Sequence, residues 1–306
     1  MKLITYSTKD GKKAGLLLDN LCIKLAPALK EYFFTARGVD AKVKNDMTAL
    51  IAEGLLSSQN LKGLSKWLGE AGRARKFAEK EIPRPEAPLL PGKIIALGRN
   101  FKAHAKEQNA PAPKEPIIFE KASSSVIGHF GEVVYAGFIK KECGKAARVD
   151  HEVELGVVIG KTAKNVKAKS SMDYIFGYTV INDVTARSIQ EKDFKLNQPW
   201  FRSKSLDTFC PMGPWIVTKD EVSNPHNLKL SCKVNGQVMQ SGSTKDFIFR
   251  IPEVIEYITK YLTLFPGDVI STGTVDGISP VKPGDLMTCE VEKVGILVNK
   301  VVKGLH

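Results

Sequence analysis

Three carboxylates in this sequence are spaced so that they can bind one divalent cation. Glu152 and Glu154 lie two residues apart in an apolar run typical of a buried strand, and such side chains point to the same face. A second apolar run, 174–181, is followed closely by Asp183. Neighbouring buried carboxylates repel each other, which raises a pKa or favours a bound cation. Three hard oxygen ligands predict Mg²⁺, Mn²⁺ or Ca²⁺ rather than zinc.

A candidate general base lies upstream of these carboxylates. His104 and Glu107 are three residues apart, so they share a face if the segment is helical. A carboxylate bonded to one imidazole nitrogen fixes the tautomer and raises the basicity of the ring. The pair therefore predicts proton transfer near neutral pH.

Two further segments carry groups that favour an anion. Lys204 lies in an aromatic, proline-bounded stretch, 200–215, and a partly desolvated ammonium group there seeks an anion. Thr274 lies in the Gly- and Thr-rich segment 271–277, whose backbone N–H groups can bind an oxyanion at a strand end.

Each pattern also has a structural explanation without catalysis. A Glu-x-Glu pair is usual on a solvated strand face, and Asp183 can cap a helix. A surface lysine such as Lys204 commonly extends its ammonium group into water, and a His near a Glu also occurs by chance. The set favours the chemical interpretation, because the acids lie among apolar residues where an unpaired charge is costly.

Taken together, the motifs resemble the fumarylacetoacetate hydrolase family. The similarity covers residues 93 to 300 and rests on four segments: GRN followed by HxxE (98–107), ExE followed by NDVTAR (152–187), KSxDTFCPxGPW (204–215) and TGT (272–274). The sequence departs from the family pattern at Phe101, where we expect Tyr, at Ala122, where we expect Pro, and at Val275-Asp276, where Pro-Ala is commoner.

The resemblance implies a role for each of these residues. The residues expected to bind Mg²⁺ or Mn²⁺, with Ca²⁺ an option in crystals, are Glu152, Glu154 and Asp183. The expected catalytic residues are His104 and Glu107, on a lid over the substrate, and Lys204, beside the metal. The residues expected to contact the substrate are Arg99, Lys121, Ser123, Arg187, Gln190 and Thr274.

The resemblance also implies the substrate class and the reaction. The substrate is a small 2-oxo acid that chelates the metal, which acts as a Lewis acid so that an enolate forms at carbon 3. Lys204 stabilises the developing oxyanion, and His104 with Glu107 moves the proton or activates a water. We expect hydrolytic C–C cleavage of an acylpyruvate or fumarylpyruvate. Decarboxylation of an oxaloacetate-like acid and isomerisation of a 2-hydroxyhepta-2,4-diene-1,7-dioate are the alternatives. The expected assembly is a homodimer.

Two other function classes compete with this interpretation. Clustered acids and a formal net charge of +12 are also compatible with a metal-dependent nuclease. The basic residues are spread along the chain without a recognition motif, so we expect no nucleic-acid partner. A metal-stabilised binding module is the second rival, and it predicts that replacing His104 changes no rate.

Length and composition are those of a globular protein without a membrane partner. The chain has 306 residues, of which 43% are hydrophobic and 25% charged, compatible with one or two domains. The N-terminus lacks the apolar stretch of a signal peptide, and no run reaches transmembrane length. Five scattered cysteines without CxxC spacing indicate reduced thiols and a cytoplasmic compartment.

The elements that must position these residues are mostly strands. Residues 2–25 predict a small β-meander, and 46–56 and 61–77 predict helices. Four prolines within 82–91 predict an extended linker and hence a domain boundary.

The later segments predict further strands, at 93–97, 117–121, 132–135, 215–218, 228–234, 238–240, 268–272 and 286–302, with one helix at 251–262. We therefore predict a mainly β fold with α-helices. The family resemblance makes it a mixed β-sandwich roll in a catalytic domain, 83–306, with a small N-terminal α+β domain, 1–82.

Overall fold

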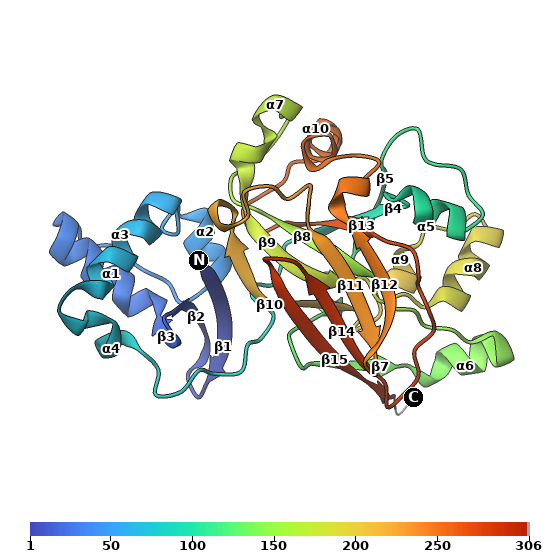
Figure 1. Ribbon diagram of the computed structural model, residues 1–306, viewed down its shortest axis with the longest axis horizontal. Helices are drawn as coiled ribbons and strands as arrows, with labels where there is room; N and C mark the ends of the chain where they lie inside the picture. The colour runs from blue at the N-terminus through green and yellow to red at the C-terminus, as the bar shows by residue number, and fades with distance from the viewer. Residues whose placement is uncertain (305–306) are drawn as a thin grey trace.

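Two β-sheets form the framework of the molecule, as the resemblance implied (Figure 1). The computed structural model describes residues 1–304. Within them the larger sheet has ten strands, nine of which follow the order β3-β2-β1-β10-β9-β8-β13-β4-β5, while β6 pairs with β10. The smaller sheet of the described chain has the order β12-β11-β14-β15-β7. The fold is mixed α/β, and it is not a doubly wound parallel sheet.

The central strands of the larger sheet contain or adjoin the candidate metal-binding and substrate-binding residues. Its strands are β1 (Lys2–Thr8), β2 (Gly11–Leu18), β3 (Leu21–Lys24), β4 (Ile94–Gly98), β5 (Ile117–Lys121), β6 (Val126–Ile127), β8 (Val153–Ile159), β9 (Ile175–Asn182), β10 (Cys210–Thr218) and β13 (Val269–Thr274). Strand β8 pairs antiparallel with β9 on one side and with β13 on the other. This arrangement brings three motif-bearing segments side by side.

The smaller sheet packs on the larger one and closes the core. Its strands are β7 (Glu132–Tyr135), β11 (Lys229–Val234), β12 (Gln237–Ser243), β14 (Leu286–Val291) and β15 (Gly295–Lys303). Asn235 and Gly236 join β11 to β12 with φ angles of 51° and 85°, as the predicted hairpin requires. Leu155 of β8 and Leu230 of β11 belong to one buried apolar cluster, so side chains from both sheets fill the space between them.

Helices cover the sheets and supply part of the site. They are α1 (Leu25–Arg37), α2 (Met47–Ala52), α3 (Ser58–Gly69), α4 (Arg73–Phe77), α5 (Lys102–Glu107), α6 (Gly137–Cys143), α7 (Ala168–Ser171), α8 (Arg187–Lys195), α9 (Phe201–Lys204) and α10 (Ile251–Tyr261). In Figure 1, α5, α8 and α9 lie near β4 and β5, away from the N-terminal helices.

The N-terminal segment extends the larger sheet instead of standing apart from it. Strand β1 pairs with β10 through Lys2↔Val217 and Leu3↔Ile216. Its helices pack on this part of the sheet, and Leu29 of α1 shares a buried cluster with Ile216. The linker at 82–91 is largely free of helix and strand, and the domain boundary placed there stays a prediction.

Some elements differ from the prediction: the helix predicted at 61–77 is divided into α3 and α4, and the strand predicted at 286–302 is divided into β14 and β15. Helix α1 was not predicted, although its buried face follows the helical spacing of Leu25, Leu29 and Tyr32, because Pro27 interrupts the pattern; a proline is tolerated in a first turn. Strand β10 begins at Cys210, five residues before the predicted start, since Pro211 and Pro214 obscured it.

The sequence led to predictions about membrane-spanning helices and about the state of the cysteines, and the structure describes both. No helix of the described residues is long and apolar enough to cross a membrane. All five cysteines lie in the described chain, and each is a free thiol.

Candidate active site

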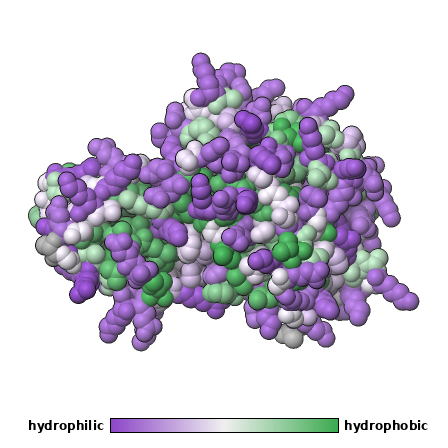
Figure 2. Space-filling view, viewed as in Figure 1, coloured by the Kyte–Doolittle hydropathy of each residue, from purple (hydrophilic) through white to green (hydrophobic). Residues whose placement is uncertain are grey.

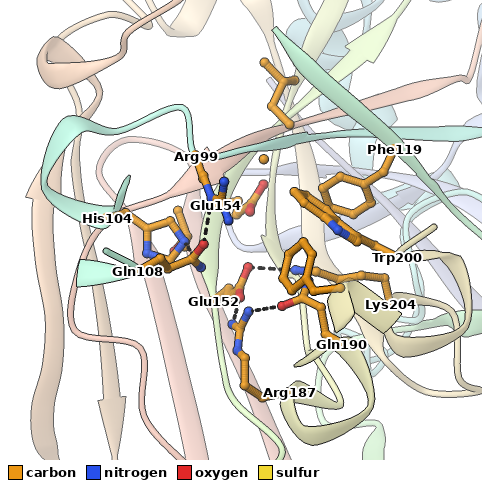
Figure 3. Close-up of a pocket in the computed structure, with 14 residues that line it drawn as sticks. Arg99, His104, Gln108, Phe119, Glu152, Glu154, Arg187, Gln190, Trp200 and Lys204 are labelled. Carbon is orange, nitrogen blue, oxygen red and sulfur yellow. Dashed lines mark hydrogen bonds and ion pairs between the residues drawn. The ribbon is translucent and has the colours of Figure 1, made fainter. Parts of the chain in front are cut away.

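A small pocket opens where β4, β8 and β13 meet α5, α8 and α9 (Figure 3). It holds about 20 Å³ of free volume and is lined by residues from each of these elements. Among them are Arg99, His104, Glu152, Arg187 and Lys204, all of which the sequence had marked.

Three carboxylates meet at the inner end of this pocket. Glu154 projects from β8, Glu152 lies immediately before that strand, and Asp183 immediately follows β9. The antiparallel pairing of β8 with β9 places their ends together, so one oxygen of each carboxylate lies within 4.8 Å of the others. All three residues are at most 4% exposed. The structure thus brings together the three residues that the sequence proposed as metal ligands.

Buried cations compensate two of the three carboxylates. Lys204 Nζ lies 2.9 Å from Glu152 Oε2 and 2.5 Å from Asp183 Oδ2. Lys121 Nζ lies 2.6 Å from Asp183 Oδ1, and Arg187 donates to Glu152. Burial alone would raise the pKa of Glu152, but Lys204 and Arg187 outweigh it and hold that pKa well below its usual range.

Glu154 has a different environment from its two neighbours. It accepts hydrogen bonds from Ser271 Oγ at 2.6 Å and from the Gly273 N–H at 2.7 Å, and no ion pair reaches it from any described residue. Burial, together with the charges of Asp183 and Glu152, raises the pKa of Glu154 to about 8.

The carboxylate cluster therefore favours an added positive charge. Its three hard oxygen donors, without a His or Cys ligand in the group, fit a divalent cation such as Mg²⁺ or Mn²⁺. A cation bound there would be held by Glu152, Glu154 and Asp183.

The predicted imidazole–carboxylate pair forms on α5. His104 Nδ1 lies 3.0 Å from Glu107 Oε2, and the other carboxylate oxygen accepts from the Gly277 N–H at 2.9 Å. Burial raises the pKa of Glu107, but the bonds from His104 and Gly277 outweigh that effect and lower it. Gly277 has a φ of 92°, and a Cβ there would lie 2.1 Å from the Met239 carbonyl oxygen, so the contact requires glycine.

The remaining predicted residues divide into two groups. Gln190 and Thr274 line the pocket, as the sequence led us to expect. Lys121 is fully buried behind Asp183 and does not line the pocket. Ser123 also lies outside the lining and donates to the Pro91 carbonyl oxygen at 2.6 Å. In this structure Lys121 and Ser123 therefore contact the protein, and their predicted contact with substrate stays a prediction.

An aromatic wall opposite His104 was not predicted. Trp200 packs edge-on against Phe119 and Phe194, with ring centroids 5.3 and 5.2 Å apart. Lys204 Nζ lies 5.2 Å from the centroid of Phe119. A Cβ on Gly98 would lie 2.5 Å from the Trp200 ring, so only glycine permits this approach. The sequence shows aromatic residues next to Lys204, but Phe119 and Gly98, which contact Trp200, come from distant segments.

Comparisons with known proteins find similar sequences and similar structures. Residues 93–302 match the family model described as fumarylacetoacetate (FAA) hydrolase C-terminal. The human protein oxaloacetate tautomerase FAHD2A, mitochondrial, is 44% identical over 247 residues, covering 77% of this chain and 76% of that protein.

Solved structures match along nearly the whole chain. The 5-carboxymethyl-2-hydroxymuconate delta-isomerase from Mycobacterium smegmatis is 32% identical with a TM-score of 0.72, over 100% of both chains. The maleylpyruvate hydrolase from Sphingobium sp. SYK-6, in complex with manganese (II) ion and pyruvate, is 29% identical with a TM-score of 0.73. That match covers 99% of this chain and 100% of the other.

We expect cation binding to release about one proton from the metal-free protein at neutral pH, because the raised pKa keeps Glu154 largely protonated until the ion binds. Calorimetric titration with Mg²⁺ in two buffers of different ionisation enthalpy measures this release. In Glu154→Gln the release should disappear and affinity should fall about 100-fold. Glu290→Gln, at an exposed position of β14, is the matched control. Binding without proton release in the wild type would contradict this prediction.

We expect Lys204→Met to destabilise the metal-free protein by about 3 kcal/mol, because it leaves Glu152 and Asp183 buried with less positive charge. Added Mg²⁺ should restore part of this loss. Urea unfolding with chelator and with Mg²⁺ measures both effects, and Lys30→Met on the exposed side of α1 is the control. Unchanged stability in chelator would show that the ion pairs do not hold the cluster together.

Proposed function

Because the chain belongs to the fumarylacetoacetate hydrolase family of enzymes, we propose that it catalyses keto–enol tautomerisation of a small dicarboxylic 2-oxo acid of the oxaloacetate type. The observation that carries this proposal is the pairing of His104 with Glu107 across a small pocket from the carboxylate cluster. A 44% identical relative carries the name oxaloacetate tautomerase.

The charge of the pocket supports a substrate with a second carboxylate. Arg99 lines it and, among the described residues, is hydrogen-bonded only to the neutral Gln108 side chain, so a second carboxylate has a guanidinium group to bind.

The proposed mechanism assigns each charged group one task. A bound Mg²⁺ or Mn²⁺ supplies Lewis acidity, which makes the proton on carbon 3 more acidic. His104 takes that proton, and Glu107 holds the opposite ring nitrogen and stabilises the charge that the ring acquires. Lys204 donates a hydrogen bond to the 2-oxo oxygen, where negative charge develops. That oxygen then takes a proton from solvent and His104 returns its own proton to solvent, so the keto form becomes the enol without gain or loss of atoms.

Hydrolysis of an acylpyruvate, the reaction that the sequence led us to expect, is the second candidate. The likeness to maleylpyruvate hydrolase favours it. In this reaction His104 takes a proton from a water, which attacks the distal carbonyl of the substrate. The C–C bond then breaks, carbon 3 of the resulting pyruvate enolate takes the proton from His104, and pyruvate leaves with a second acid.

We expect His104→Asn to lower the rate of enol-to-keto conversion of oxaloacetate by roughly 10²- to 10⁴-fold, because it removes the base that moves the proton. Conversion is followed by enol absorbance with Mg²⁺ or Mn²⁺, and calorimetry checks that the variant still binds the ion. A wild-type rate equal to the uncatalysed rate, or a fully active variant, would overturn the proposal.

The products distinguish the candidate reactions. Incubating the enzyme with oxaloacetate and with fumarylpyruvate, followed by assay of pyruvate and of CO₂, separates them. We expect proton exchange at carbon 3 of oxaloacetate without net loss of either substrate. Pyruvate from fumarylpyruvate would establish hydrolysis, and CO₂ with pyruvate from oxaloacetate, formed faster than with the metal ion alone, would establish decarboxylation. Either product would replace tautomerisation as the assigned reaction.

The assembly and the compartment belong to the same proposal. Val238, Leu286 and Ile296 are 55%, 44% and 46% exposed on the outer face of the smaller sheet, and Figure 2 shows apolar patches over this region. Exposed apolar groups on one sheet face are typical of an interface and support the expected homodimer. Light scattering should then give about twice the 33.6 kDa chain mass.

A cytoplasmic compartment stays a prediction, since the human relative is named mitochondrial.

A further inference from the structure

Gln108 connects two groups of the site that are otherwise separate (Figure 3). It is the first residue after α5, and its backbone N–H donates to the His104 carbonyl oxygen. Its side-chain Oε1 accepts from Arg99 Nε at 3.0 Å, and its Nε2 lies 2.9 Å from His104 Nε2. One amide therefore bridges a cation of the pocket to the nitrogen that would accept the proton.

The chemical groups of Arg99 and Glu107 fix which atom donates and which accepts in each hydrogen bond that joins them through Gln108 and His104. A guanidinium group can only donate, so the oxygen of Gln108 faces Arg99 and its NH₂ group faces His104. The NH₂ group can only donate, so His104 Nε2 is the acceptor and carries no proton. At the other end the Glu107 carboxylate accepts from Nδ1. The ring is thus neutral, with its proton on Nδ1.

Arg99 is placed to exchange this amide for an anion. It has a φ of 55°, an uncommon conformation for a residue other than glycine. Burial lowers the pKa of Arg99, and no ion pair joins it to an acidic side chain among residues 1–304. A neighbouring cavity of about 490 Å³ is lined by three arginines, Arg99, Arg148 and Arg187, and by two glutamates, Glu107 and Glu191. A carboxylate entering there finds a guanidinium group bonded only to a neutral amide.

We propose that Gln108 is a positioning residue that keeps the proton off His104 Nε2 and uncovers this nitrogen when a substrate carboxylate replaces the amide on Arg99. The inference rests on the proposed function, since it assumes that His104 acts as the base. It deepens that function by coupling recognition of the second carboxylate to release of the base, so a dicarboxylic acid is favoured over a monocarboxylic one.

The other charged groups that face the imidazole do not replace this role. Glu107 bonds to the opposite nitrogen, and Glu152 and Arg187 act on the pair only through their fields. Gln108 is the described side chain that contacts Nε2 itself.

Two substitutions of similar size separate a donor role from a structural one. Gln108→Glu keeps the shape and an acceptor for Arg99, but it presents an acceptor to Nε2 and so draws a proton onto it. Gln108→Met removes both bonds without adding an acceptor. We expect kcat to fall roughly 100-fold or more in Gln108→Glu and less than about 10-fold in Gln108→Met. A merely structural role predicts the reverse order, and equal or reversed losses would overturn the proposal.

The coupling itself is measured by comparing substrates with and without a second carboxylate. In the wild type, only oxaloacetate has the second carboxylate that would displace Gln108 from Arg99 and uncover His104 Nε2. The ratio of the exchange rate at carbon 3 of oxaloacetate to that of pyruvate therefore includes this displacement. In Gln108→Met the nitrogen is permanently uncovered, so we expect this ratio to fall about 10-fold. An unchanged ratio would show that Gln108 does not couple Arg99 to the base. Gln237→Glu, at an exposed position of β12, controls for the added charge of Gln108→Glu.

A spectroscopic readout keeps this inference separate from the proposed function. The ¹⁵N resonances of His104 should show a neutral ring protonated on Nδ1 in the wild type and a doubly protonated ring in Gln108→Glu at the same neutral pH. A wild-type ring protonated on Nε2 would overturn the inference even in an active enzyme. A protein that turns over no 2-oxo acid but shows the expected resonances would overturn the proposed function alone.

Discussion

The burial of three carboxylates in one pocket is the constraint on which the rest of the site depends. Each charge removed from water costs several kcal/mol unless it is compensated, so the surrounding elements must supply cations and donors at fixed places. Helix α9 provides Lys204, β5 provides Lys121, α8 provides Arg187, and the end of β13 provides the bonds to Glu154. The compensation is incomplete at Glu154, and its raised pKa reflects burial and the negative charge of its two neighbours.

The two-sheet framework explains how such a site can be rigid. The acids stand on or beside central strands that are paired on both sides, while the base stands on a short helix tied to the loop after β13 by a single carboxylate. The carboxylates, which are the candidate metal ligands, are therefore held by the sheet, and His104, the proposed base, is held by a helix at the rim.

The candidate metal ligands and the His–Glu pair could be predicted from the sequence because their spacing reflects local structure. Glu152 and Glu154 share a face through strand alternation, and His104 meets Glu107 through one helical turn. What could not be predicted depends on distant segments. Nothing near Lys121 in the sequence indicates that it lies behind Asp183, and Trp200 reaches Gly98 only through the fold. Helix α1 was missed because its first turn holds a proline, and the contact between Gln108 and Arg99 spans a turn whose shape the sequence does not specify.

The short pairing of β1 with β10 has a consequence for how the chain avoids misassembly. An unpaired strand at the margin of a sheet exposes backbone N–H and C=O groups that can template aggregation. Strand β1 covers the Ile216–Val217 part of β10 and moves the margin of the sheet outward to β3, a strand of only four residues that Ala78 partly covers. A short margin offers few hydrogen bonds to another chain. The N-terminal segment thus protects the sheet that carries the carboxylates, whatever further task it has.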